Sequence, residues 1–394
     1  MIALFLAPLY ILLNFYLARW LLRWMGACTK HFRRRGLQIF IVVVYCFISS
    51  SILTAFLLPW RWLKYVANTW FGTACYILLT VIIVDGIRLL LKYVFKVKWD
   101  WLGSRKTFVR VGTICIAIIL SLSVYGTLNA RYIRITDYQV DLAKETPELD
   151  GMRIVLVADL HLGYNKGLSQ MTQMVRKINE QEPDLVVIAG DIFDNEFEAI
   201  NQPAKIAKVL RQIKSTYGTY ACYGNHDIEE KILAGFTFSS KEKKMASPEM
   251  DQFLVDAGVT LLRDDGVTLP NGVQLYGRAD RERPGRGIET RKTPEEITAN
   301  LDQEKPIFII DHEPDELEEL ASAGVDLDLA GHTHNGQMWP GTLTIGFFWE
   351  NPYGELKVGD MTNIVTSGVG VFGANMRVGT KAEIAVITIG DGVK

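Results

Sequence analysis

The residues best suited to chemistry lie after residue 150, where five of the six histidines of the chain occur with aspartate or asparagine in short runs. Each run ends a stretch of β-branched and other apolar residues, so each is predicted to lie where a strand passes into a loop. Open α/β sheets bind their ligands at such strand ends. A single buried histidine is more often a core residue, but the joint placement indicates a binding site. The runs are Asp159-Leu160-His161, Gly190-Asp191, Gly224-Asn225-His226-Asp227, Asp311-His312 and Gly331-His332-Thr333-His334.

The residue types in these runs are those that bind divalent cations. Carboxylate, amide and imidazole groups without a thiolate suit manganese, iron or zinc, and we expect manganese. Two cations in a hydrolytic site lie about 3.5–4 Å apart and share an oxygen ligand, for which Asp191 is well placed. Asp159 and His161 are two residues apart on an extended segment, so their side chains point the same way and can hold one ion together.

The remaining runs supply ligands for a second ion. His332 and His334 have the same spacing as the first pair, but two imidazoles so close together can each serve a different ion. Asn225 offers a neutral oxygen and His312 a further nitrogen. The sequence therefore predicts two divalent metal ions with a ligand set of Asp159, His161, Asp191, Asn225, His312, His332 and His334.

The elements that must position these runs alternate between strands and helices over residues 131–394, the range expected for the second domain. Short apolar runs predict strands, and 3.6-residue periodicity predicts helices. Such alternation, followed by further strands, predicts an α/β sandwich with mixed sheets. A hairpin is expected around Pro270-Asn271-Gly272. The predicted strands are Tyr132–Val140, Arg153–Ala158, Leu185–Ala189, Thr219–Tyr223, Ile307–Ile310, Leu327–Ala330, Asn363–Thr366 and Glu383–Ile389, and the predicted helices are Leu168–Asn179, Pro203–Lys214, Pro248–Asp256, Pro294–Leu301 and Pro314–Ala323.

The first domain, residues 1–130, is expected to be a transmembrane region of about four helices. Four stretches are long enough to cross a bilayer and apolar all round, whereas the helices of a soluble bundle would show a polar face. The first stretch contains Asn14 and Arg19 and lacks a small-residue cleavage site, which indicates an anchor rather than a signal peptide. The stretches are Ile2–Leu22, Leu37–Trp60, Trp70–Leu91 and Val111–Leu128.

The basic residues of the short loops predict the orientation. Lysine and arginine are concentrated in the first and third loops, which are therefore expected in the cytoplasm. We therefore expect an integral protein of the cell membrane. Its second domain is expected on the extracytoplasmic side. The net charge of −2 gives no sign of a nucleic-acid partner. Cys222 is the one cysteine after residue 130 and is expected to be a core residue.

Taken in order, the five runs resemble the motifs of the calcineurin-like metallophosphoesterase superfamily, which includes purple acid phosphatases and DNA-repair nucleases. The similarity covers residues 151–389, and all five motifs are present. It implies a four-layer α/β/β/α sandwich, here preceded by the transmembrane region. The transmembrane region resembles that of the membrane-anchored bacterial members of the superfamily. That subgroup is in turn similar to phosphodiesterases that act on lipid or cell-envelope phosphates.

The resemblance also implies how the ligands are shared. One ion would be held by Asp159, His161, Asp191 and His334, and the other by Asp191, Asn225, His312 and His332. A hydroxide bridging the two cations would attack phosphorus, because metal binding lowers the pKa of water toward about 7. His226 is expected to protonate the departing oxygen. Asp227 is expected either to orient His226 or to cap a following helix.

Two segments are expected to shape an amphiphilic phosphate-ester substrate. The segment Ile232–Met245 mixes apolar residues with lysines, as segments that contact lipid headgroups do. An aromatic run after the last motif either packs in the core, which is the more frequent case, or lies beside the catalytic cleft. We therefore expect hydrolysis of a phosphodiester or pyrophosphate in a lipid-linked or envelope molecule, with membrane lipids as partners. The run comprises Met338, Trp339, Phe347, Phe348, Trp349 and Tyr353.

Several alternatives remain open at this stage. Asp194 could reach the site, although capping or solvent exposure is expected of it more often. Arg278, Arg281 and Arg283 either clamp a phosphate or lie in a solvated loop. A catalytically silent, membrane-anchored sensor or interaction module would keep the fold but lose a ligand, and no ligand is missing. A transporter is disfavoured, because the four stretches contain few charges.

Overall fold

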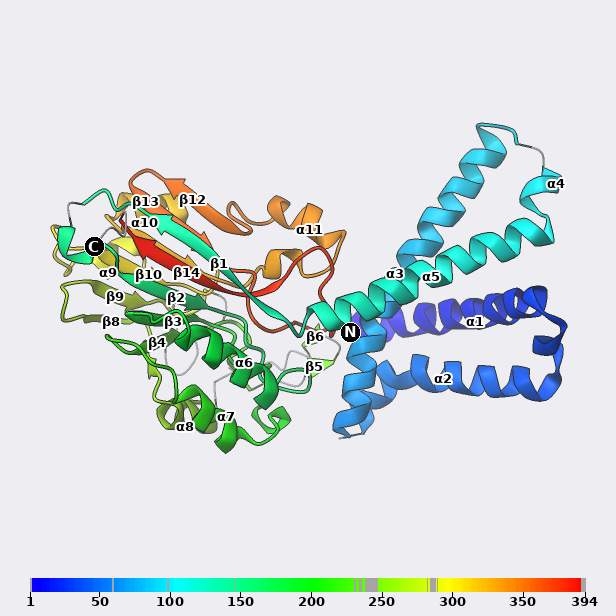
Figure 1. Ribbon diagram of the computed structural model, residues 1–394, viewed down its shortest axis with the longest axis horizontal. Helices are drawn as coiled ribbons and strands as arrows, with labels where there is room; N and C mark the ends of the chain where they lie inside the picture. Colours follow the sequence, from blue (N-terminus) through cyan, green and yellow to red (C-terminus); the bar gives the residue numbers. More distant parts are fainter. Residues whose placement is uncertain are drawn as a thin grey trace. The chain divides into compact units, whose positions relative to one another are not determined.

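The structure is a computed structural model that describes residues 2–58, 60–97, 99–144, 146–229, 232–233, 236–237, 247–281, 283, 288 and 290–390. The chain divides into two compact units, Met1–Tyr125 and Gly126–Lys394. Helices make up the first unit, and the second contains two large β-sheets with helices around them (Figure 1).

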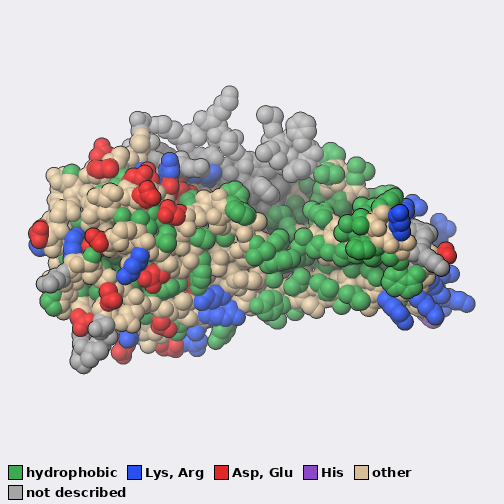
Figure 2. All heavy atoms as spheres, turned by 90° about the horizontal axis from the view of Figure 1, so that it is seen from above, with side chains coloured by type: hydrophobic (Ala, Val, Ile, Leu, Met, Phe, Trp, Pro, Cys, Tyr) green, Lys and Arg blue, Asp and Glu red, His purple; other side chains and the backbone are tan. Residues whose placement is uncertain are grey.

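Long helices dominate the first unit. They are α1 (Ile2–Cys28), α2 (Arg35–Leu57), α3 (Arg61–Tyr93) and α5 (Arg105–Asn129), and α4 (Trp99–Leu102) is a short turn between the last two. Three of them, α2, α3 and α5, are long and apolar enough to cross a membrane, and hydrophobic side chains cover much of this unit (Figure 2). These spans indicate an integral membrane protein. The span expected at Ile2–Leu22 falls in α1, whose first side chains lie outside the described residues, and it stays a prediction.

The basic segments of the first unit lie at one end of it. The guanidinium group of Arg105, at the start of α5, donates to the carbonyl oxygen of Ala27, near the end of α1, from Nε at 2.8 Å and from Nη2 at 2.6 Å. Lysine and arginine side chains gather at this end (Figure 2). The first and third loops therefore share a side, as the orientation argument requires, but which side is cytoplasmic stays a prediction.

Two six-stranded mixed sheets form the centre of the second unit. In the first sheet, β2, β3, β4 and β7 are parallel, and β14 is antiparallel to β2. In the second sheet, β9, β10, β11 and β13 are parallel, and the edge strands are antiparallel to their neighbours. The predicted α/β sandwich with mixed sheets is confirmed. The first sheet has the order β1 (Ile133–Val140), β14 (Ala382–Ile389), β2 (Arg153–Val157), β3 (Leu185–Ala189), β4 (Thr219–Cys222), β7 (Thr260–Leu261), and the second β12 (Gly354–Val358), β13 (Met361–Val365), β11 (Leu327–Ala330), β10 (Ile307–Ile310), β9 (Gln274–Gly277), β8 (Asp265–Thr268).

Helices cover the outer faces of both sheets. Alternate residues of a strand point to opposite faces, so Val155 of β2 packs toward the helices of the first sheet, whereas Leu156 packs between the two sheets. Strands buried on both faces are mostly apolar, which is why short apolar runs predicted them, although β11 also contains the buried Asp328. The helices are α6 (Leu168–Asn179), α7 (Pro203–Leu210) and α8 (Pro248–Ala257) on the first sheet, and α9 (Pro294–Thr298) and α10 (Leu317–Ser322) on the second.

The structure corrects several details of the predicted elements. Helix α10 begins at Leu317 rather than at Pro314, because Glu316 adopts a left-handed conformation with φ of 59°. The run after the last motif is not core throughout, since Phe347 is 85% exposed and Phe348 77%. Most of the predicted lipid-contact segment Ile232–Met245 lies outside the described residues. The edge strand β12 was not predicted, although its residues alternate between half-buried and exposed.

Candidate metal centre

The predicted ligands come together where strands of both sheets end. Asp159 and Asp191 follow β2 and β3, and Asn225 follows β4 in the same sheet. His312 and His332 follow β10 and β11 of the other sheet. Because each set of strands is parallel, their carboxyl ends lie at one edge of the sandwich.

One group of ligands gathers around His161 and His334. These two side chains and Asp159 each offer one atom, and the three atoms lie within 4.8 Å of one another. The Nε2 atoms of the two imidazoles are 3.0 Å apart, and Nε2 of His334 is 3.5 Å from Oδ1 of Asp159. All three side chains are buried.

A second group gathers around His312, which forms a similar cluster with Asp159 and Asp191. Nε2 of His312 lies 3.2 Å from Oδ2 of Asp191, 3.1 Å from Oδ1 of Asn225 and 3.1 Å from Nδ1 of His332. Oδ2 of Asp191 is also 3.7 Å from Nε2 of His161, in the first group. Asp191 therefore stands between the two groups, where a bridging ligand would stand.

These distances are those expected of atoms that share a metal ion. Ligands about 2.1 Å from an ion and at right angles to one another are roughly 3 Å apart. Three polar atoms lie at this distance from Nε2 of His312 at once, namely oxygens of Asp191 and Asn225 and Nδ1 of His332, and a single proton on Nε2 could be shared with only one of them. The donor set therefore fits divalent cations, and it forms a buried Asp/His metal-binding site.

Further groups hold the imidazoles in position. Nδ1 of His312 donates to the carbonyl oxygen of Ala189 at 2.9 Å, which leaves Nε2 free to bind an ion. Oδ1 of Asp194 lies 3.5 Å from Nδ1 of His161, and Asp194 is buried, so it neither caps a helix nor faces solvent. Oε1 of Glu313 lies 3.8 Å from Nε2 of His332. The rings of His161 and His332 thus each have a carboxylate on the side away from the cluster, and the ring of His312 has a backbone carbonyl there.

Arg377 is a further positioning group, and no motif in the sequence marked it. Its side chain is fully buried, and Nη2 lies 3.1 Å from Nδ1 of His334. Burial, together with the nearby His161 and Arg377, holds the pKa of His334 well below its usual range. The ring is therefore neutral, which is the form that binds metals.

The remaining pKa shifts show a site crowded with charge. Burial lowers the pKa of His332 to about 3. Burial, opposed by His312, raises the pKa of Asp159 to about 6. The pKa of Asp191 is held well below its usual range despite burial, because His312 and His226 lie close to it. Buried carboxylates and the neutral rings of His332 and His334 together form an environment that favours cations.

The backbone of the ligands is strained. Positive φ angles occur at Asp159 (52°), His161 (44°), Asp191 (50°), His332 (67°) and His334 (49°). Such conformations are uncommon for residues other than glycine and cluster at functional sites. The chain therefore holds the ligands by irregular loops rather than by regular strands.

Two glycines allow the loops to come this close. A Cβ atom on Gly224 would lie 2.7 Å from Cδ2 of His312 and also against Oδ1 of Asp191. A Cβ atom on Gly331 would lie 2.8 Å from Oδ2 of Asp159. Both positions therefore require glycine for the ligand cluster to keep its shape.

His226 lies beside the cluster, and the hydrogen bonds described for Asp227 are with other groups. The oxygens of Asp227 accept backbone N–H bonds from Phe193 at 2.8 Å and from Gly224 at 2.7 Å, so Asp227 secures the loop. No helix begins within residues 223–229, the last described residues before a gap. Nδ1 of His226 instead contacts Oδ1 of Asn195. The backbone N–H of His226 donates to Oδ1 of Asp191 at 2.8 Å, and burial lowers the pKa of the ring to about 4.

The three arginines of the predicted basic cluster have different surroundings. Arg278 is fully buried and pairs with Asp311 at 2.7 Å and Glu316 at 2.5 Å, so it lies neither in a solvated loop nor at a phosphate clamp. Arg281 is exposed and pairs with Asp315. Arg283 donates to the carbonyl oxygen of Asn225 at 3.0 Å. Cys222 is a buried core residue, as predicted.

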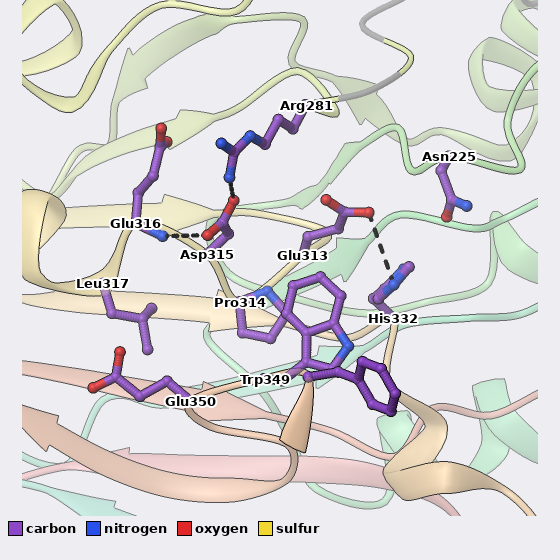
Figure 3. Close-up of a pocket in the computed structure, with 11 residues that line it drawn as sticks. Asn225, Arg281, Glu313, Pro314, Asp315, Glu316, Leu317, His332, Trp349 and Glu350 are labelled. Atoms are coloured by element: carbon purple, nitrogen blue, oxygen red, sulfur yellow. Dashed lines mark hydrogen bonds and ion pairs between the residues drawn. The ribbon is translucent and has the colours of Figure 1, made fainter. Parts of the chain in front are cut away.

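A pocket of about 630 Å³ adjoins the metal centre (Figure 3). Asn225 and His332 line it, so the pocket and the metal centre share two side chains. The Trp349 ring stands edge-on to the His332 ring, with 4.9 Å between centroids. The other lining residues are Arg281, Glu313, Pro314, Asp315, Glu316, Leu317, Phe348 and Glu350.

Comparison with known proteins agrees with this architecture. Residues 152–336 match the model of the calcineurin-like phosphoesterase family. These residues lie within the second unit, a sandwich of two mixed sheets, which is therefore similar to calcineurin-like phosphoesterases.

Three relatives illustrate the range of similar proteins. A transmembrane protein with metallophosphoesterase domain from Danio rerio is 30% identical over 71% of this chain and 63% of its own length. An uncharacterized metallophosphoesterase of Campylobacter jejuni is 25% identical over 88% of both chains. The UDP-2,3-diacylglucosamine pyrophosphatase LpxG of Chlamydia trachomatis is 24% identical over 59% of this chain and 81% of its own. The chain thus spans somewhat less than two thirds of the Danio rerio protein.

Proposed function

We propose that the protein is a metal-dependent phosphoesterase that hydrolyses a phosphodiester or pyrophosphate bond in an amphiphilic substrate. The observation that supports this most strongly is the set of three polar atoms within 3.2 Å of Nε2 of His312, continued by the cluster at His161 and His334. When bound there, two divalent ions would supply an activated water and neutralise the phosphate oxygens. Manganese is our first choice, with iron or zinc as alternatives.

The ligands would be divided between the ions by the groups already described. We assign Asp159, His161 and His334 to the first ion, and Asn225, His312 and His332 to the second. Asp191, which lies between the groups, would be shared. The distances within each group and the position of Asp191 support this division.

His226 is the residue we propose for proton transfer to the leaving oxygen. It is 7% exposed and follows the ligand Asn225, so a phosphate at the metal centre would come within its reach. Asn195 contacts its Nδ1 atom and is fully buried, and it would hold the ring in place. The negative charge of a bound phosphate favours the protonated form of the ring.

The pocket supports a substrate with an apolar part next to the phosphate. Phe348 and Trp349 form an aromatic wall, and His332 connects this wall to the metal centre. The Chlamydia trachomatis relative is named for a diacylated sugar nucleotide with a pyrophosphate bond, which is a molecule of this kind. We propose a lipid-linked or envelope phosphate for this chain, with the catalytic domain on the extracytoplasmic side.

The test is turnover of bis-p-nitrophenyl phosphate by the full-length protein in detergent. We expect activity with added manganese, loss of activity with a chelator and recovery when manganese is restored. Substitution of His226 by Asn should lower kcat by roughly 10²–10⁴-fold while leaving the metal content unchanged. A protein that holds two ions per chain and hydrolyses no diester, monoester or pyrophosphate would instead be a metal-binding sensor, and the proposal would be wrong.

A further inference from the structure

An exposed apolar surface lies on the segment that follows the last metal-binding run. We call it the aromatic rim and define it by Trp339, Leu343, Phe347 and Phe348, which are 41%, 67%, 85% and 77% exposed. Only three other large hydrophobic side chains are exposed in the described part of the second unit, namely Leu128, Tyr132 and Val255. Concentrated apolar exposure of this kind marks a surface that contacts a partner or a membrane.

The rim is an ordered structure that holds its side chains outward. It contains the short helix α11 (Gly341–Thr344) and a 3₁₀ turn at Ile345–Phe347. The N–H of Leu343 donates to the carbonyl oxygen of Pro340 at 2.9 Å, and the N–H of Phe348 donates to that of Ile345 at 3.0 Å. The rim therefore has a defined backbone conformation that presents these exposed side chains.

The rim is hydrogen-bonded to a segment that also contacts the end of helix α5. Helix α5 is one of the candidate membrane spans. The N–H of Trp339 donates to the carbonyl oxygen of Val378 at 2.7 Å. The neighbouring Arg377 donates its N–H to the carbonyl oxygen of Gly126 at 2.9 Å, and its own carbonyl oxygen accepts from Nδ2 of Asn129 at 3.0 Å. One short segment thus contacts both the last turn of α5 and the start of the rim.

Residues just after α5 have the character of a membrane interface. Tyr132 is 57% exposed, and the cationic groups of Arg134 and Lys177 each lie 5.5 Å from the centroid of its ring. Tyrosine and tryptophan favour the boundary between headgroups and acyl chains, and basic residues are attracted to anionic lipids. Leu128 and Tyr132, two of the other exposed hydrophobic residues, therefore belong to the same end of the unit as the rim.

We propose that the aromatic rim is a membrane-contact surface, inserted into the headgroup boundary of the same bilayer that α5 crosses. Aromatic and leucine side chains on a short structured segment are suited to this depth. Phe348 belongs both to the rim and to the pocket wall. If the proposed phosphoesterase function holds, a lipid-linked phosphate would reach the pocket without leaving the membrane surface.

The test measures the surroundings of single side chains in the full-length protein, reconstituted into vesicles of phosphatidylcholine and phosphatidylglycerol. The five native cysteines are first replaced. A nitroxide label is then attached to a single new cysteine, introduced by Leu343→Cys or by Phe347→Cys. Val255→Cys on α8, where the native side chain is 64% exposed, is the matched control. Relaxation by oxygen, which partitions into lipid, is compared with relaxation by a water-soluble nickel chelate.

We expect the labels at 343 and 347 to be more accessible to oxygen than to the nickel chelate, and the label at 255 to show the reverse. Rim labels as accessible to the nickel chelate as the control would overturn the proposal. Labels that are immobile and inaccessible to both reagents would also overturn it, because the rim would then be covered by protein. The measurement involves no turnover, so its failure is distinct from failure of the phosphoesterase function.

Discussion

Two buried charged clusters meet at one peptide bond, between Asp311 and His312, and they differ in how their charges are balanced. Asp311 and Glu316 pair with Arg278 at 2.7 and 2.5 Å, and Arg291 adds a contact of 2.8 Å to Glu316. On the other side, His312 faces acceptor atoms that a single proton cannot satisfy. The arginine cluster is electrically complete, whereas the metal centre becomes complete only with cations. Substitutions in the first should therefore affect folding, and substitutions in the second should affect metal binding and turnover.

The largest effect is expected from Asp191→Asn. Loss of the shared carboxylate should lower kcat on bis-p-nitrophenyl phosphate by about 10³-fold, which corresponds to roughly 4 kcal/mol, and should reduce the metal content measured by mass spectrometry. Thermal unfolding without metal serves as the control and should change little. Full metal content together with full turnover would show that Asp191 is not a ligand.

Arg278→Met should lower the stability of the fold and leave metal binding unchanged, the opposite of Asp191→Asn. Removing one partner of a buried ion pair leaves uncompensated charge and costs about 3–5 kcal/mol, so we expect a large loss of stability in chemical unfolding of the detergent-solubilised protein. The fraction that folds should keep its metal content. Arg281→Met is the matched control, because its exposed pair with Asp315 should contribute no more than about 1 kcal/mol. Equal effects of the two substitutions would contradict the comparison.

The sequence allowed the ligands to be predicted because each follows a short apolar strand and lies in a run with a distinct composition. It did not allow the second layer of contacts to be predicted. Asn195, Glu313 and Arg377 approach their partners across long stretches of chain, and no local periodicity marks them. Arg278 shows the same difficulty, since an arginine after a strand is usually solvated, and its partner Asp311 lies 33 positions away.

The fold shows a similar division between local and long-range information. Strands buried on both faces, such as β3 (Leu185–Ala189), could be predicted from composition alone. The exposure of Phe347 could not, because it depends on whether another part of the chain covers it. The hydrogen bonds of Asp227 could not be predicted for a related reason. Its neighbour in sequence is His226, but its hydrogen-bond donors are backbone N–H groups of Phe193 and Gly224.

A smaller effect, on metal affinity, would distinguish the two ion sites of the metal centre. Asp194→Asn should weaken the ion bound by His161 about 10–100-fold, because carboxylates behind ligating imidazoles orient and polarise them. Glu313→Gln is the matched variant and should weaken the ion bound by His332. Competition with a fluorescent chelator measures both affinities. If either substitution weakened both ions equally, the assignment of ligands to separate ions would be wrong.

The smallest effect concerns Lys166, a third kind of buried charge. Its ammonium group donates to two neutral oxygens, that of Ala130 at 2.6 Å and Oε1 of Gln170 at 3.0 Å. Burial, with repulsion from Arg377 and Arg131, lowers its pKa to about 7. Between pH 7 and about 10 the unfolded chain therefore binds more protons at this position than the folded chain does, so stability should rise with pH.

The slope from this residue is at most about 1.4 kcal/mol per pH unit. Lys166→Met should remove it, and chemical unfolding between pH 7 and 9 would measure the difference between the variant and the natural protein. Identical slopes in the two proteins would show that Lys166 stays charged in the folded state.

The glycines that flank the ligands have a consequence for how such a protein could lose activity during evolution. One added methyl group at Gly224 would press on Asp191 and His312, although every donor residue would still be present. A descendant with alanine at this position would keep all the metal-ligand residues. Its ligand cluster would nevertheless lose the shape needed to bind the cations. A search that identifies inactive paralogues by their missing ligands would overlook such a descendant. The glycines between the ligands should therefore be compared as well as the ligands themselves.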